Sequence, residues 1–252
     1  MKSLKKELAS NRLTLGSWVT LADTATCEIM AKSGFDWLTV DMEHSAITLS
    51  EAQELIRVID LSGCKPFVRI GENSPNFIKQ VMDAGAHGVI VPMVNSKEDA
   101  IKAVGACKYP PSGKRGVGLA RAQGYGLEFE KYKTWLDKES VVIVQIEHID
   151  AVNNLDEILS VEGVDASIIG PYDLSASLGC PGDFDKKEVR NAIGKYLETC
   201  NKFGKSAGIH VISPDGEKVN KRIKEGFRFV AFSLDTLFLA KRIKEEFVKI
   251  KK

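Results

Sequence analysis

Short apolar runs alternate along the chain with longer segments that have a helix-like pattern of apolar and polar positions. The runs are rich in β-branched and aromatic residues, which is typical of strands. We therefore expect eight strands, at Leu15–Thr20, Trp37–Val40, Pro66–Ile70, Gly88–Val94, Val141–Ile146, Ala166–Ile169, Ser206–Val211 and Phe229–Phe232.

Most segments between these runs carry helix signals at their ends, such as capping residues and terminal glycines. One helix is expected to open with Ser50 as its N-cap and to end near Gly63. Another is expected to begin at Ser74-Pro75, with proline at the first helical position, and to close at Gly85. The full set of expected helices adds Thr24–Ser33, Ser96–Ala106, Asp150–Ser160, Lys186–Phe203 and Asp235–Lys252.

Strands that alternate with helices predict βαβ units and a parallel sheet. Eight such units in 252 residues match the α/β TIM barrel, the (β/α)₈ fold, in both count and length. An open doubly wound sheet would normally carry a glycine-rich fingerprint in its first turn, which this chain lacks. We therefore expect residues 1–252 to form one TIM-barrel domain. The one irregular stretch, Tyr109–Trp135, is long enough to be a functional loop or an interface.

The composition excludes several classes of protein. Lys and Arg number 35 against 34 Asp and Glu, and this balance argues against nucleic-acid and membrane-surface partners. No segment has the length of a membrane span or the pattern of a signal peptide. The five cysteines form no CxxC pair, so we expect free thiols in a reducing, cytoplasmic protein; they are Cys27, Cys64, Cys107, Cys180 and Cys200.

Two carboxylates follow neighbouring predicted strands, and in this barrel the carboxyl ends of the strands form the active site. Glu147 directly follows the fifth strand and Asp173 follows the sixth. If they lie close together they need a cation or a shared proton, and an all-carboxylate site with positions open to water suits a hard divalent ion. The alternatives are a salt bridge to a nearby Lys or Arg, or a capping role for Asp173 at the next helix.

Asp41 and His44 follow the second strand, and Arg69 ends the third. A histidine oriented by a carboxylate is a candidate general acid or base, although a buried histidine satisfied by its neighbours is commoner. An arginine at the mouth of the barrel requires an anion. That anion could be a protein carboxylate such as Glu147 or Asp41, a substrate carboxylate, or a developing enolate.

Lysine is missing from the expected strand interiors. A Schiff-base aldolase in this fold needs a lysine inside the barrel. Here the lysines lie on helices, in loops or just before strands, as Lys65 and Lys205 do. We therefore expect no Schiff-base lysine and no imine chemistry.

Several motifs in a fixed order span the chain from about Leu15 to about Phe238. In order and spacing they resemble the metal-dependent, class II pyruvate aldolases of the 4-hydroxy-2-oxoheptanedioate aldolase and 2-dehydro-3-deoxyglucarate aldolase type. The motifs are Gly34-Phe35-Asp36-Trp37-Leu38, Asp41-Met42-Glu43-His44, Tyr109-Pro110-Pro111-Ser112-Gly113-Lys114-Arg115-Gly116-Val117-Gly118, Val144-Gln145-Ile146-Glu147 and Ile169-Gly170-Pro171-Tyr172-Asp173-Leu174-Ser175.

The resemblance implies a catalytic role for each matching position. Glu147 and Asp173 would be the protein ligands of a divalent metal, with Mg²⁺, Mn²⁺ or Co²⁺ as candidates. His44 would be the catalytic histidine and Asp41 its orienting partner. Arg69 would bind the keto oxygen and stabilise the enolate.

The resemblance also implies binding and assembly features. Gly170 and the backbone of Tyr172 would lie against the pyruvate carboxylate, and Gln145 would lie near the metal. Asp83 would support the active site of a neighbouring subunit, from behind the residues that contact the substrate. The family forms hexamers, trimers of dimers, with an exchanged C-terminal helix, to which Asp235–Lys252 would correspond.

Three departures from the typified members concern the substrate. Tyr172 replaces a small residue at the pyruvate end, where we therefore expect a narrower or altered pocket. The segment 119–126 matches only in part, and His210 stands on the seventh strand where those members carry an apolar side chain. We expect the last two to face the aldehyde part of the substrate, and we include Trp18, at the end of the first strand, among the substrate-binding residues.

The expected function is reversible aldol cleavage of a 4-hydroxy-2-oxo acid, sugar-acid derived or dicarboxylic, into pyruvate and an aldehyde. One alternative is a related metal-dependent carbon–carbon lyase acting on an acyl-CoA, although no dense Lys/Arg cluster stands near the mouth to bind the nucleotide. Another is a non-catalytic sugar-acid-binding barrel, which would not need a base such as His44.

Overall fold

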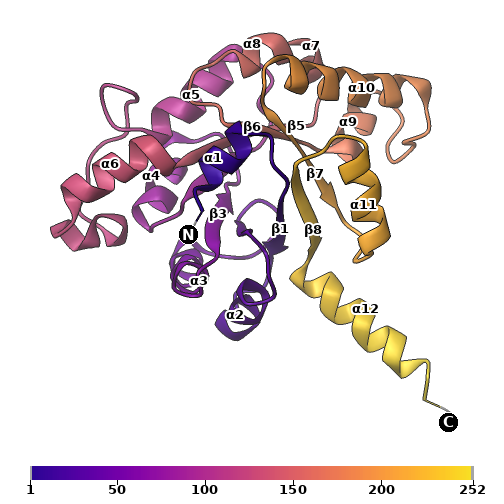
Figure 1. Cartoon of the computed structure of the whole chain (residues 1–252), viewed down its shortest axis with the longest axis horizontal. Coiled ribbons are helices and arrows are strands. Elements are labelled where there is room, and N and C mark those ends of the chain that lie inside the picture. The colour runs from indigo at the N-terminus through magenta and orange to yellow at the C-terminus, as the bar shows by residue number, and fades with distance from the viewer. Residues whose placement is uncertain (1, 251–252) are drawn as a thin grey trace.

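Eight parallel strands close into a barrel in the computed structural model, which describes residues 2–250 (Figure 1). Each strand pairs with the next along the chain, and the eighth pairs with the first. The predicted TIM barrel is therefore confirmed. Its strands are β1 (Thr14–Val19), β2 (Trp37–Asp41), β3 (Lys65–Arg69), β4 (Gly88–Val91), β5 (Val141–Ile146), β6 (Ala166–Ile169), β7 (Ser206–Val211) and β8 (Phe229–Leu234).

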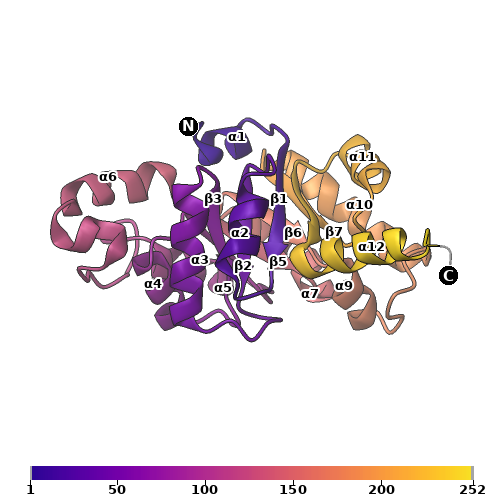
Figure 2. The same cartoon turned by 90° about the horizontal axis from the view of Figure 1, so that it is seen from below.

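Helices surround the barrel and connect its strands (Figures 1 and 2). Between β1 and β5 they are α2 (Thr24–Ala31), α3 (Leu49–Leu61), α4 (Pro75–Asp83), α5 (Lys97–Cys107), the 3₁₀ turn η1 (Arg121–Gly126) and α6 (Phe129–Glu139). The later ones are α7 (Ile149–Asn153), α8 (Leu155–Leu159), α9 (Pro171–Ser177), α10 (Lys187–Lys202), α11 (Gly216–Lys224) and α12 (Asp235–Phe247). A short first helix, α1 (Leu4–Ala9), places Leu4 and Leu8 in the apolar cluster inside the barrel.

Some helix ends differ from the prediction. The N-cap of α3 is Thr48, not Ser50, because Thr48 forms a reciprocal capping box with Glu51. The segment predicted as one helix at Asp150–Ser160 is divided at Asn154 into α7 and α8. The stretch expected to be irregular contains η1 and the start of α6.

The last helix, α12, projects away from the barrel, at the opposite end of the molecule from α6 (Figures 1 and 2). It ends at Phe247, before the predicted end at Lys252, which together with Lys251 lies outside the described residues. Its only buried residue is Asp235. The apolar side chains of Leu239, Ile243 and Phe247, spaced four residues apart, are exposed.

Aromatic side chains fill the amino end of the barrel. Trp37 stacks on Phe229 with ring centroids 4.1 Å apart, and Phe67 packs against both rings. Gly16 provides the space for this layer, because a Cβ there would lie 2.0 Å from the Trp37 ring. This end is sealed, so any substrate must enter at the carboxyl end, the mouth. Among residues 2–250, no helix combines the length and apolarity needed to cross a membrane.

Candidate active site

Polar side chains form the uppermost layer of the barrel. In a strand, alternate residues face the same side, and most inward positions below this layer are apolar or aromatic. At the mouth the inward positions become Asp41 on β2, Arg69 on β3, Gln145 on β5 and His210 on β7, with Glu147 just beyond β5. The change from apolar to polar marks the mouth as the place for chemistry.

Asp41 and Arg69 form a buried ion pair at the centre of the mouth. They are register partners on adjacent strands, which places their side chains next to each other. The Arg69 Nε and Nη2 groups donate to the two Asp41 oxygens at 2.9 and 2.6 Å. On its other side the Arg69 Nη1 lies 3.2 Å from Oε2 of Glu43. Two carboxylates thus fix the guanidinium, while some of its N–H groups stay free for a ligand.

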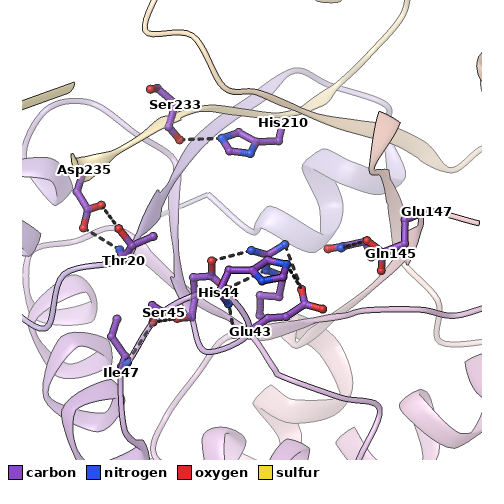
Figure 3. A network of polar contacts seen from close by, with 12 residues as sticks. Thr20, Glu43, His44, Ser45, Ile47, Gln145, Glu147, His210, Ser233 and Asp235 are labelled. Carbon is purple, nitrogen blue, oxygen red and sulfur yellow. Dashed lines mark hydrogen bonds and ion pairs between the residues drawn. The ribbon is translucent and has the colours of Figure 1, made fainter. Parts of the chain in front are cut away.

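The ring of His44 lies at the edge of the mouth, with 69% of its side chain exposed (Figure 3). Asp41 accepts hydrogen bonds from the backbone N–H groups of Glu43 and His44, at 3.1 and 3.2 Å. The carboxylate nearest the ring belongs to Glu43, whose Oε2 lies 3.8 Å from the His44 Nε2. Asp41 therefore holds the turn that carries His44, whereas Glu43 faces its ring.

Glu147 is buried, and its carboxylate is fixed from two sides. Its Oε1 accepts from the backbone N–H of Met93 at 2.8 Å. Its Oε2 accepts from the Gln145 amide at 2.5 Å (Figure 3). Met93 adopts a left-handed backbone with φ of 51°, a conformation that costs about 1–2 kcal/mol for a residue other than glycine. This strain directs an N–H group at the carboxylate.

Asp173 approaches Glu147 across Gly170. A Cβ on Gly170 would lie 3.3 Å from the Glu147 Oε2 and 3.9 Å from the Asp173 Oδ2, so both oxygens face the same small space. No Lys or Arg pairs with either carboxylate in the described part of the chain. The N-cap of α9 is Gly170, and Asp173 lies inside the helix, so the capping alternative is wrong.

The donor set of this carboxylate pair fits a hard divalent cation. Among the described residues, the mouth brings together at least four carboxylates, those of Asp41, Glu43, Glu147 and Asp173, and one guanidinium, that of Arg69. Burial raises the pKa of Glu43, and the charge of Glu147 adds to this effect, while Arg69 opposes it. Residues 2–250 contain no cluster of three or more potential metal-ligating side chains. Two carboxylates with several open positions are typical of Mg²⁺-like ions, which retain water.

His210 and Arg69 flank the indole of Trp18. The ring centroids of Trp18 and His210 are 5.5 Å apart, and the Arg69 Cζ lies 4.3 Å from the centre of the indole. The His210 Nε2 lies 3.1 Å from the carbonyl oxygen of Ser233 (Figure 3). Burial lowers the pKa of His210 to about 4. The three predicted side chains are thus brought together on one side of the mouth.

The remaining predicted residues lie in two different places. The side chain of Tyr172 is exposed and rests beside Gly182, so it does not narrow the space between Glu147 and Asp173. Asp83 ends α4 at the amino end of the barrel, opposite the mouth. There it accepts hydrogen bonds from Arg115 at 2.5 Å and from Gln123 at 3.3 Å. It does not contact the mouth of its own barrel.

Four further residues contribute to the mouth, and the sequence alone assigned a role to none of them: Glu43, Met93, Ser233 and Asp235. Glu43 stands in the same motif as Asp41 and His44, and this position was the available signal. Met93 and Ser233 act through backbone groups and both have positive φ, which the side-chain pattern does not reveal. Asp235 at the start of α12 also acts on the mouth, because it accepts hydrogen bonds from the backbone and hydroxyl of Thr20 (Figure 3).

Comparisons with known proteins agree with this geometry. The family model described as HpcH/HpaI aldolase/citrate lyase matches residues 14–241. The hydroxypyruvate/pyruvate aldolase of Roseobacter denitrificans is 37% identical over 241 residues, or 95% of this chain and 93% of that protein. The 4-hydroxy-2-oxovalerate aldolase of Rhodococcus jostii is 39% identical over 243 residues, or 96% and 93% of the two chains. A crystal structure of an HpcH/HpaI aldolase/citrate lyase family protein from Burkholderia cenocepacia matches with a TM-score of 0.94 and 29% identity, covering 100% of both chains. The chain belongs to the HpcH/HpaI aldolase/citrate lyase family.

Proposed function

We propose that this chain is a divalent-metal-dependent aldolase that reversibly cleaves a 4-hydroxy-2-oxo acid into pyruvate and an aldehyde. The observation that carries the proposal is the coexistence in one mouth of an unpaired carboxylate couple and a firmly held arginine. Glu147 and Asp173 need a cation, whereas Arg69 has N–H groups free for an anion. A 2-oxo acid bound with a divalent ion satisfies both requirements. Membership of an aldolase family supports this choice of reaction.

Glu147 and Asp173 would hold the cation, and Mg²⁺, Mn²⁺ or Co²⁺ would suit this pair of carboxylates. When bound, the cation would polarise the 2-keto group of the substrate. Gln145 fixes the orientation of the Glu147 carboxylate through its 2.5 Å hydrogen bond. Gly170 keeps the space between the two carboxylates open, since a Cβ there would lie 3.0 Å from the Glu147 Cβ. The pyruvate carboxylate would face the free N–H groups at the start of α9, at Tyr172.

Arg69 stabilises the negative charge that the reaction creates. Breaking the C3–C4 bond leaves its electron pair on the three-carbon fragment, which becomes an enolate. The guanidinium is held by Asp41 and Glu43 before the substrate arrives, so it need not reorganise as the charge develops. Such preorganised groups are among the largest contributors to catalysis.

His44 exchanges the protons of the reaction. In cleavage it takes the proton of the C4 hydroxyl, which becomes the aldehyde carbonyl as the C3–C4 bond breaks. A proton then adds to C3 of the enolate to give pyruvate, and the reverse order of events forms the carbon–carbon bond. The exposed ring of His44 at the rim of the mouth suits this role. Trp18 and His210 line the side of the mouth where the aldehyde part would lie.

We further infer that the chain works as an oligomer, with a hexamer of three dimers as the expected form. The exposed apolar stripe of α12, including Leu239, Ile243 and Phe247, is suited to pack against a second copy. Asp83 does not contact its own mouth, which leaves it available to the site of a neighbouring copy, and Arg115 fixes its orientation. The buried free cysteines suit a reducing compartment such as the cytoplasm, and residues 1–252 would form one catalytic domain.

Exchange of the methyl protons of pyruvate in D₂O tests this function without an aldehyde. The metal-loaded protein should exchange these protons, and EDTA should abolish the exchange until Mg²⁺, Mn²⁺ or Co²⁺ is returned. His44→Ala should slow exchange by roughly 10²-fold, as expected for loss of an acid–base group. Exchange that survives thorough chelation would contradict the role of the metal. A protein that binds pyruvate and metal but catalyses no exchange would instead be a binding barrel.

A further inference from the structure

His210 is the only histidine whose ring lies inside the described part of the barrel. It occupies an inward position of β7, between the outward-facing Ile209 and Val211, which belong to the apolar layer under the helices. Its ring packs against Trp18, and the same indole also contacts the guanidinium of Arg69. A substrate held by Arg69 therefore has His210 as a near neighbour along the same indole.

The contact with Ser233 fixes which nitrogen of His210 carries the proton. A carbonyl oxygen can only accept, so the His210 Nε2 must donate across its 3.1 Å contact with the Ser233 carbonyl. The same oxygen also accepts from the Ser17 hydroxyl at 3.1 Å. The hydroxyl of Ser233 donates to the Ile212 carbonyl at 2.8 Å, which holds Ser233 in its left-handed conformation.

The ring stays neutral at physiological pH. Burial lowers the pKa of His210, and the neighbouring positive charge of Arg69 acts in the same direction. The Ser233 carbonyl and the Asp41 carboxylate act in the opposite direction, but the pKa remains at about 4. In a neutral imidazole with its proton on Nε2, Nδ1 bears a lone pair and is an acceptor.

The acceptor nitrogen is open to the mouth. The Nδ1 of His210 has no hydrogen-bond partner among residues 2–250. It is also absent from the buried side-chain atoms that lack a partner, so its surface is accessible. Because the ring lies inside the barrel above a packed aromatic layer, the space that Nδ1 meets is the mouth.

We propose that His210 selects an aldehyde that carries a hydroxyl group beside its carbonyl, and that the hydroxyl donates a hydrogen bond to Nδ1. This inference rests on the proposed aldolase function. A lone pair attracts a hydroxyl proton but repels the oxygens of a carboxylate, and it gains nothing from a methyl group. The natural substrate is then a polyhydroxylated 2-oxo acid, of the kind derived from a sugar acid, and not a dicarboxylic one.

Glycolaldehyde and propanal form a matched pair for the test, because they differ by a hydroxyl in place of a methyl group. Each is offered with pyruvate and metal, and the ratio of the two kcat/KM values is compared between variants, so that the intrinsic reactivity of the aldehydes cancels. His210→Leu should lower this ratio by roughly 3- to 10-fold, the usual worth of one hydrogen bond. His210→Asn should keep the ratio within about twofold of the wild type, since its Oδ1 can take the place of Nδ1.

His87→Leu is the control, because His87 precedes β4 at the amino end of the barrel, where it pairs with Asp60 at 3.3 Å. It should leave the ratio unchanged. An unchanged ratio in His210→Leu, or an equal fall in His210→Asn, would overturn the proposal; His210→Met gives the same test if the leucine variant does not fold. Pyruvate proton exchange by the wild type, which needs no aldehyde, separates this outcome from failure of the aldolase function itself.

Discussion

Replacing Asp41 by asparagine tests whether this carboxylate acts on Arg69 or on the ring of His44. The asparagine oxygen can replace the Asp41 Oδ1, which accepts from the Arg69 Nε and from two backbone N–H groups. The turn that carries His44 is then retained. The amide NH₂, however, faces the Arg69 Nη2, which lies 2.6 Å from Oδ2 in the native protein. Two donors oppose each other there, and the guanidinium loses one of its anchors.

The size of the effect follows from the bond that is lost. A charge-assisted hydrogen bond is worth about 2 kcal/mol, which corresponds to roughly 30-fold in rate if the bond positions Arg69 for the enolate. The assay is pyruvate proton exchange by Asp41→Asn, His44→Ala and the double variant. If Asp41 acts through Arg69, the two losses multiply, so the double variant falls by about 3,000-fold given roughly 10²-fold for His44 alone.

A different result would refute this reasoning. If Asp41 instead orients the ring of His44, Asp41→Asn will cost nothing further once the ring has been removed. Asp36→Asn is the matched control, because the Asp36 carboxylate also accepts a backbone hydrogen bond, from Leu15 at 2.8 Å, but lies at the amino end of the barrel. That variant should exchange pyruvate protons at the wild-type rate.

Three further predictions concern the lysines, the barrel core and the response to acid. Borohydride added with pyruvate should leave the protein unlabelled by mass spectrometry, because the only lysine in the described strands, Lys65, begins β3 at the closed end; an adduct on any lysine would contradict the metal-dependent mechanism. Gly16→Ala should lower the free energy of unfolding in urea by at least about 3 kcal/mol, since its Cβ would lie 2.0 Å from Trp37, and a loss below 1 kcal/mol would show that the aromatic layer can yield. The pKa of His210 falls from 6.5 when unfolded to about 4 when folded, so the unfolded chain binds the extra proton and stability falls as the pH drops through this window. The free energy of unfolding of the wild type should therefore fall by about 2.5 kcal/mol more than that of His210→Asn between pH 7 and pH 4.5. Urea titrations at one protein concentration measure both falls, and equal falls would contradict the burial of a neutral ring.

The strands were predictable because a buried parallel strand is nearly continuous in apolar residues and is bounded by turn signals. All eight appear in the barrel, and β5, β6 and β7 have the predicted bounds. Helix ends were less predictable because several polar residues compete to cap them. At α3 both Thr48 and Ser50 could serve, and the reciprocal bonds of Thr48 with Glu51 decide between them.

The pattern of residues along the chain determined the barrel, and with it the end at which the polar side chains gather. This follows because alternation along each strand and a single order of strands leave one mouth for Asp41, Arg69, Glu147 and His210. The pairing within the mouth was left open, with Arg69 free to meet Glu147 or Asp41. The tertiary structure decided it, because register places Arg69 beside Asp41, and the turn after β2 brings Glu43 to its other side.

Only the tertiary structure also shows the backbone's part in the site. Met93 and Ser233 adopt left-handed backbone conformations that their residue types do not predict. Contacts with the surrounding structure keep the backbone in these strained conformations. One directs an N–H group at Glu147, and the other directs a carbonyl at His210. The first contact fixes the orientation of the Glu147 carboxylate, and the second fixes the tautomer of His210. Both depend on the positions of backbone atoms in the folded chain, which the residue types alone do not specify.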